Sequence, residues 1–96
     1  MIEVRSSGAG EPPSYEVVVR EGGGETRHLV TLEQETCRRL TAGAASPETC
    51  IEAAFRFLLD REPKEAILAR FDIMVIARYF PEFERELPTY LARGGG

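Results

Sequence analysis

Apolar and polar residues alternate in the first third of the chain, which is the pattern of strands with one buried face. The two clearest runs are residues 15–20 and 26–31, both rich in β-branched side chains and separated by the glycine-containing stretch 21–25. They predict an antiparallel hairpin with a flexible loop. Residues 2–5 alternate as well, and we expect a third, edge strand there because an isolated two-stranded ribbon is only marginally stable in water.

The spacing of apolar residues becomes helical after Thr31. The stretch 31–34 reads Thr-Leu-Glu-Gln, the form of a capping box, in which a threonine hydroxyl and a glutamine side chain satisfy free backbone N–H groups. It predicts a short helix over about 32–41.

The next helix has the clearest apolar stripe in the chain. Ser46 followed by Pro47 indicates its start, because proline has no N–H to lose at the first helical position. Four apolar residues then follow at helical spacing: Ile51, Ala54, Phe55 and Leu58. We expect Phe55 and Leu58 in the core, and an end near Arg61 because the next residue precedes a proline.

Two similar apolar segments follow, at residues 66–71 and 74–79. Both are predicted to be helical, with Asp72 between them as a cap for the second. A last short helix is expected over residues 82–92, interrupted by Pro88.

These elements predict an α+β fold in a single domain over residues 1–96. Residues 1–31 would supply strands and loops, with an N-terminal antiparallel sheet of two or three strands. Residues 32–93 would supply about four helices, and the glycine run 94–96 a frayed tail. Length and composition agree, since 96 residues provide one core, and 43% hydrophobic with 29% charged residues is typical of a globular domain.

The chain lacks the signals of a membrane or exported protein. No apolar run approaches the roughly 18 residues of a transmembrane helix. The opening residues Met-Ile-Glu-Val cannot serve as a signal peptide. We therefore expect a cytoplasmic protein without membrane contact.

The net charge of −4 is spread evenly, and no third of the chain is net basic. Proteins that bind nucleic acids or anionic membranes usually carry a basic patch. Nucleic acid is therefore an unexpected partner.

The residues that most often carry chemistry are few. His28 is the single histidine, and its strand neighbours supply no metal ligand at the right spacing, so we expect a structural or surface role. Cys37 and Cys50 lie on successive predicted helices and are expected to be free thiols in the core.

An acidic cluster near the C-terminus, Glu82, Glu84 and Glu86, is interpreted as an ion-paired, solvated face. No apolar surroundings that would raise a carboxyl pKa are evident. The sequence predicts no catalytic site, no metal site and no cofactor, and we expect a protein that is not an enzyme. An enzyme with an unrecognised site is the third alternative.

Residues 55–63, with the sequence FRFLLDREP, and the string FD..VIARYFPEFE at 71–84 resemble a group of small uncharacterised bacterial proteins. The likeness covers roughly residues 14–91. It implies a bacterial single-domain protein and no particular activity.

A strand ending at Leu32 and two capped helices resemble the ribbon-helix-helix proteins over residues 27–60. That family pairs its ribbon in a dimer and inserts it into the DNA major groove. The resemblance implies that Arg27, Leu29 and Thr31 would face the bases, while alternate residues face the core. A DNA-binding regulator is therefore the alternative function.

The function we expect first is binding to a protein partner, which the sequence does not identify. The sequence also leaves open whether the protein forms a homodimer. The candidate partner-binding residues are Arg78, Tyr79, Phe80 and Phe83, because Pro81 interrupts the helix there and aromatic and arginine side chains are enriched at the centres of interfaces. In the alternative interpretation, Phe80 and Phe83 close the core.

Overall fold

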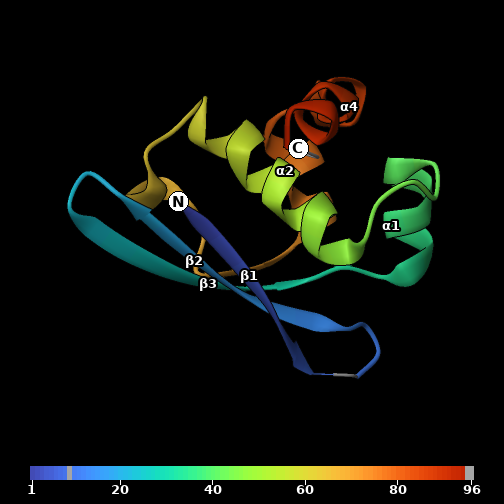
Figure 1. Ribbon diagram of the computed structural model, residues 1–96, viewed down its shortest axis with the longest axis horizontal. Helices are drawn as coiled ribbons and strands as arrows, with labels where there is room; N and C mark the ends of the chain where they lie inside the picture. Colours follow the sequence, from blue (N-terminus) through green and yellow to red (C-terminus); the bar gives the residue numbers. More distant parts are fainter. Residues whose placement is uncertain (9, 95–96) are drawn as a thin grey trace.

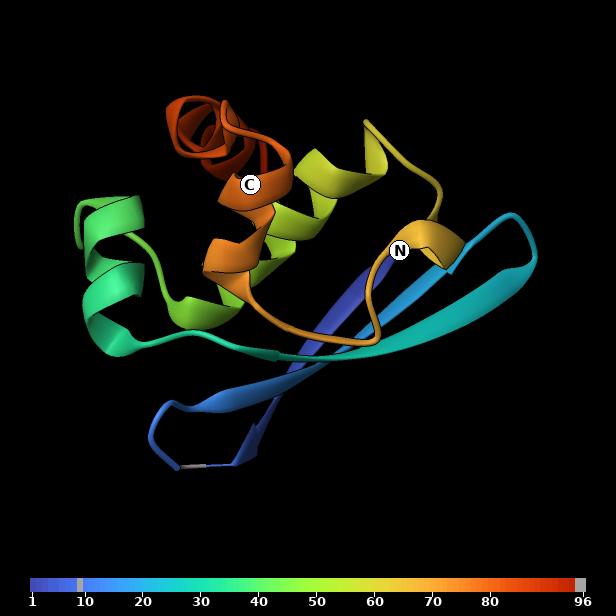
Figure 2. The same ribbon diagram turned by 180° about the vertical axis from the view of Figure 1, so that it is seen from behind.

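Four strands form one sheet, and the helices lie on one of its faces (Figure 1, Figure 2). The computed structural model describes residues 1–8 and 10–94. The elements in chain order are β1 (Ile2–Gly8), β2 (Ser14–Glu21), β3 (Gly24–Thr31), α1 (Gln34–Thr41), α2 (Pro47–Leu59), the 3₁₀ helix η1 (Lys64–Ala66), β4 (Arg70–Asp72), the 3₁₀ helix η2 (Ile73–Val75), α3 (Ile76–Tyr79) and α4 (Phe83–Gly94). The predicted α+β fold is confirmed.

The sheet has the strand order β1-β2-β3-β4. Its first three strands are antiparallel, as predicted, and β4 adds a short parallel strand that the sequence did not reveal. The hairpin between β2 and β3 turns on two residues, Gly22 and Gly23, with φ of 62° and 79°. Two consecutive positive φ values define a tight turn that glycine adopts without steric cost, so the expected flexible loop over 21–25 was wrong.

The two faces of the sheet have different chemistry. Val17, Val19 and Val30 point toward the helices and are fully buried. Val18 points to the opposite, helix-free face and is also buried, with Glu3 and Arg27 as its cross-strand neighbours. Ion pairs across this face join five residues: Glu3, Arg20, Glu25, Arg27 and Glu16. Charged side chains therefore cover the apolar centre of the open face.

The capping box predicted before α1 was wrong. Thr31 does not cap the helix; its hydroxyl donates to Asp72 at 2.7 Å, because β4 places Asp72 opposite Thr31 in the sheet. The helix begins at Gln34, and Glu33 at its N-cap makes no side-chain cap bond. The Thr31 hydroxyl, which the local sequence predicts to cap the helix, thus bonds to a residue that is distant in the sequence.

The start of α2 agrees with the sequence. The Ser46 hydroxyl accepts from the backbone N–H of Thr49 at 3.2 Å, and Pro47 is the first helical residue. Phe55 and Leu58 are buried as predicted. The opposite side of the helix is buried too, through Cys50, Ala53 and Phe57. In Figure 1, α2 lies between the sheet and α4, so the two buried sides contact two different layers.

The helix predicted over 66–71 was wrong. After η1 the chain is extended, and Ala69 accepts a hydrogen bond from the N–H of Leu29 at 2.8 Å before β4 pairs with β3. The Phe71 ring packs 5.9 Å from that of Phe55. Apolar residues that could form a helix therefore complete the sheet edge. The segment 74–79 is helical along its whole length, as predicted, with its first two residues in the 3₁₀ helix η2 and the rest in α3.

The cap predicted at Asp72 is confirmed, because its carboxylate accepts from the N–H of Met74 at 3.0 Å. The last helix is not interrupted, since α4 continues through Pro88 to Gly94. Of the expected frayed tail, residues 95 and 96 lie outside the described residues. Within the described residues, none of the helices has the length and apolar character needed to cross a membrane.

Phe55→Ala tests the sheet-facing core. The ring contacts both His28 and Phe71, and its loss leaves a cavity, so we expect the free energy of unfolding to fall by roughly 3–5 kcal/mol. Chemical denaturation monitored by circular dichroism measures the change. A variant as stable as the wild type would contradict the assignment of Phe55 to the core.

Candidate functional site

An apolar groove of about 330 Å³ lies where the end of α2, the extended segment before β4 and α3 meet. Its lining includes the side chains of Ile67, Leu68, Phe71, Ile76, Tyr79 and Phe80. Tyr79 is 68% exposed and Leu68 is 48% exposed, whereas Ile67 and Ile76 are buried. The groove therefore has a buried floor and two large apolar side chains accessible to solvent.

These two side chains are unusual within this chain. Three large apolar side chains are exposed among the described residues, namely Met1, Leu68 and Tyr79. Two of the three line the same groove. Clustering of exposed apolar side chains, in contrast to scattered single ones, is typical of an interaction surface.

The four residues predicted to bind a partner do not share one surface. Tyr79 and Phe80 line the groove, and Arg78 is exposed beside Tyr79. Arg78 makes no ion pair with any residue that the structure describes. Phe83 is fully buried, with its ring 5.1 Å from that of Phe57. Phe83 therefore closes the core, which was the alternative interpretation.

The other side of the groove has no signal in the local sequence. Leu68 and Phe71 were assigned to a helix, and only pairing of β4 with β3 brings them opposite α3. No local pattern indicates that pairing, because it joins residues about forty positions apart. The more exposed of the two accessible side chains, Tyr79, was predicted from residue type and from the interruption of the helix by Pro81.

His28 holds the extended segment in place from beneath. The ring is buried; Nδ1 lies 2.7 Å from the carbonyl oxygen of Leu68, and Nε2 lies 2.9 Å from the hydroxyl of Thr26. A carbonyl only accepts, so Nδ1 carries the proton of this hydrogen bond. The ring also lies 5.3 Å from that of Phe55. His28 is thus buried and hydrogen-bonded, which agrees with a structural role, and it positions the backbone at the rim of the groove.

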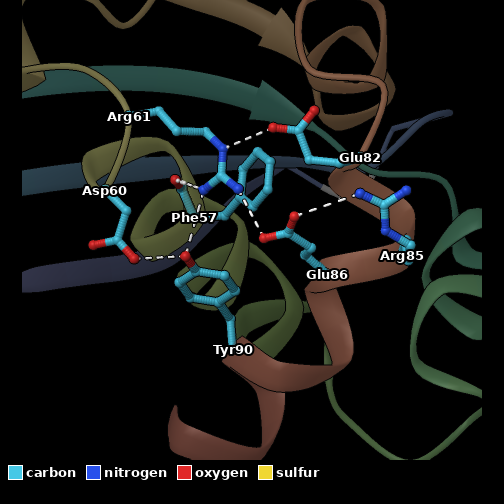
Figure 3. A network of polar contacts seen from close by, with 7 residues as sticks. All are labelled: Phe57, Asp60, Arg61, Glu82, Arg85, Glu86 and Tyr90. Atoms are coloured by element: carbon cyan, nitrogen blue, oxygen red, sulfur yellow. Dashed lines mark hydrogen bonds and ion pairs between the residues drawn. The ribbon is translucent and has the colours of Figure 1, made fainter.

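The acidic cluster is ion-paired, mainly with partners that the sequence did not indicate. Figure 3 shows the Arg61 guanidinium between two of the three carboxylates. Its Nε donates to Glu82 at 3.0 Å and its Nη2 donates to Glu86 at 2.8 Å, while Arg39 pairs with Glu84. The network therefore joins the end of α2 to α4.

Arg61, which lies in the turn after α2, also contacts that helix. Its Nη1 donates to the carbonyl of Phe57 at 3.1 Å, and the guanidinium carbon lies 3.6 Å from the centre of the Phe57 ring. Nη1 lies 3.4 Å from the Tyr90 hydroxyl, which donates to Asp60 at 2.5 Å (Figure 3). A guanidinium that lies above an aromatic ring and donates hydrogen bonds to carboxylates is held in one position.

The protonation of this network follows from its contacts. Burial alone would lower the pKa of Arg61, but hydrogen bonds with Tyr90, Glu82 and Glu86 outweigh it and raise the pKa. The backbone N–H of Glu82, and then the Arg61 guanidinium, hold the pKa of the Glu82 carboxyl below its ordinary value. Both groups are therefore charged at neutral pH, and the arrangement joins two helices instead of moving a proton.

Cys37 and Cys50 are free and buried, as predicted. Burial raises the pKa of the Cys37 thiol, and burial together with the neighbouring Cys37 raises the pKa of Cys50 to about 12. The thiolate is the reactive form of cysteine. Neither thiol is therefore poised for nucleophilic or redox chemistry.

The three residues proposed to read DNA bases share the helix-free face of the sheet. Arg27 is paired there with Glu16 and Glu25, and the Thr31 hydroxyl is bonded to Asp72. Residues 24–31 pair with β2 along their full length, and residues 29–31 also pair with β4. The strand that a ribbon-helix-helix dimer would share between two chains is thus already paired within one chain.

The described part of the chain contains no group of three histidine, cysteine or acidic residues placed to hold a metal ion. Comparison with known protein families, with curated proteins and with solved structures found no match.

Arg61→Met tests the network between α2 and α4. The variant keeps the length of the side chain and loses the charge, so we expect the midpoint of thermal unfolding at pH 7 to fall by roughly 4–8 °C. The pKa of Glu82 is lower in the folded state than in the unfolded chain. The ion pair of Glu82 therefore contributes its full stability above the ordinary pKa of a glutamate, and this stability is lost as the pH falls through the lowered pKa. The difference between wild type and variant should therefore shrink as the pH falls below the ordinary pKa of a glutamate.

The matched control is Arg85→Met, which removes an exposed arginine that reaches the same Glu86 at 3.7 Å. It should change the midpoint little. If both variants unfolded at the same midpoint as the wild type, the network would not stabilise the fold.

The thiols are expected to stay free in protein purified without reductant. Their raised pKa values leave little thiolate at neutral pH, so the intact mass should be that of the reduced chain, and thiol reagents should react fully only after denaturation. Loss of two hydrogens, with Cys37 linked to Cys50, would contradict this prediction.

Duplex DNA binding should be absent at physiological salt. The net charge is −4, and carboxylates already pair with Arg27, whereas even non-specific DNA binding needs free cations and reaches about 10⁻⁴ to 10⁻⁶ M in real DNA-binding proteins. Fluorescence anisotropy with a labelled duplex at low and physiological salt measures this. A sequence-dependent complex that persists in salt and is abolished by Arg27→Ala would favour the ribbon-helix-helix alternative.

Proposed function

We propose that the protein is a small, non-enzymatic interaction domain that binds a segment of another protein in the apolar groove. The observation that carries the proposal is the exposure of Leu68 and Tyr79 on a groove with a buried apolar floor. Full burial of a large apolar side chain contributes about 1.5–3 kcal/mol, and a partner would gain roughly half or more of this from the exposed part of each side chain. Tyrosine is also among the residues enriched at the energetic centres of interfaces.

The groove is supported on both sides, which favours binding without large rearrangement. His28 bonds to the Leu68 carbonyl on one side, and Phe71 packs against Phe55. On the other side Phe80 packs edge-on against Phe57, with ring centres 5.9 Å apart. A preformed site loses less conformational entropy on binding.

Two charged side chains suggest the chemistry of the partner: Glu62 lines the groove, and Arg78 lies beside it. Arg78 is exposed next to Tyr79 and has no ion pair with the described residues, as noted above. We infer a partner segment that inserts apolar side chains into the groove and places a carboxylate against Arg78. The free, buried thiols of Cys37 and Cys50 favour a reducing compartment, and we propose the cytoplasm as the location.

The test is photo-crosslinking in extract of the native organism, with a photoreactive phenylalanine analogue at position 79. A discrete adduct is expected, and its yield should fall when Leu68→Arg is introduced on the opposite side of the groove. Ala44→Arg is the matched control, because it adds the same charge at an exposed position in the connector between α1 and α2. The control should leave the yield unchanged.

No adduct at position 79, or an adduct equally strong with both arginine variants, would contradict the groove as the binding site. Circular dichroism of each variant checks that the fold is retained.

A further inference from the structure

The outer edge of β1 has the backbone and charge pattern of a strand that pairs with its own copy. We propose that two copies associate through antiparallel β1 strands, with a two-fold axis at Val4, so that two four-stranded sheets become one. This inference is independent of the groove. Its partner is a second copy of the chain.

The backbone hydrogen bonds show which groups of β1 are free. Met1 and Arg20 exchange both of their backbone bonds, at 2.8 Å each. In an antiparallel pair, such exchanging residues alternate with residues whose N–H and C=O point away from the partner strand. From the register, Glu3 and Arg5 bond to β2, whereas Ile2, Val4 and Ser6 present their backbone groups to the open edge.

A two-fold axis at Val4 satisfies all of these groups. Val4 pairs with the second copy's Val4. Ile2 of each copy pairs with Ser6 of the other copy. Each of the three pairs exchanges two hydrogen bonds. The β1–β2 register becomes irregular between Ser6 and Gly8, so the regular edge ends where this pairing ends.

Side-chain charges select the same register. With the axis at Val4, Glu3 lies opposite the second copy's Arg5, twice in the dimer, at the positions where antiparallel side chains approach most closely. Arg5 is exposed and makes no ion pair with the described residues. A shift of the axis by one residue would place Glu3 opposite Glu3, or Arg5 opposite Arg5, and like charges directly opposite each other destabilise a sheet.

The apolar side of the edge is incompletely covered in the single chain. Ile2 and Val4 point toward the helices and remain only partly buried. Natural edge strands that stay single are usually protected by charged side chains, proline or an early bulge. The stretch from Ile2 to Ser6 has no proline and no bulge, and its two charges, Glu3 and Arg5, are of opposite sign and face each other in the proposed pairing. Pairing would also bury more of Val4.

The surface beside this edge is hollowed. A depression of about 440 Å³ next to Ile2 is lined by residues that include Glu52, Arg56 and Leu59 of α2. Glu52 and Arg56 form an ion pair along the helix, so this surface carries both signs of charge.

Sedimentation velocity over a concentration series up to about 1 mM tests the proposal, because so short an interface gives weak, concentration-dependent association. The wild type should convert from monomer to dimer. Arg5→Glu replaces each intermolecular ion pair by two facing carboxylates, and the dissociation constant should rise about tenfold or more. The double variant Glu3→Arg, Arg5→Glu restores opposite charges and should recover the dimer.

Arg70→Glu is the matched control, since it makes the same charge change on β4 at the other end of the sheet, and it should dimerise like the wild type. Thermal melts confirm that each variant folds. A wild type that is monomeric throughout, an Arg5→Glu variant that dimerises as well as Arg70→Glu, or a folded double variant that stays monomeric would overturn the proposal.

Discussion

The fold depends on burying α2 from two sides at once. Phe55 and Phe57 are two positions apart, so they point to nearly opposite sides of the helix. Phe55 packs against His28 and Phe71 on the side of the sheet, and Phe57 packs against Phe83 on the side of α4. The sheet is the first layer and α2 the second, and α4 thus forms a third layer. The short segments between α2 and α4 follow a path that allows α2 to contact the sheet on one side and α4 on the other.

The groove follows from this arrangement. The chain leaves α2, crosses to the edge of the sheet and pairs β4 with β3, which brings Leu68 opposite Tyr79. His28 and the Arg61 network restrain the two ends of that crossing, one through the Leu68 carbonyl and the other through α4. Polar contacts at these places stabilise the path of the backbone, and the exposed apolar side chains remain available to a partner.

Local sequence patterns predicted the parts of the structure that local interactions determine. The hairpin strands, the cap at Ser46 and the sheet-facing stripe that includes Phe55 were all correct. Two of the failures share one cause, a distant contact that overrode a local preference. Asp72 took the Thr31 hydroxyl from a predicted capping box, and pairing with β3 kept the apolar run around Phe71 extended.

The same distinction applies to the candidate site. Tyr79 was predicted from residue type and from the proline that follows its helix, whereas Leu68 depended on β4 and had no local signal. The second buried stripe of α2, Cys50 with Ala53 and Phe57, did have a signal in its spacing of three and four residues. It was obscured because the first stripe alone already fits an amphipathic helix.

Native-state hydrogen exchange of α2 tests this account most directly. If α2 is buried between the sheet and α4, its central amides should exchange only through global unfolding, with the same free energy as the amides of β2 and β3. The amides of α4 should exchange at that free energy or somewhat below it. Exchange of the central α2 amides through a smaller opening, while those of β2 and β3 stay protected, would contradict a fold built around this helix.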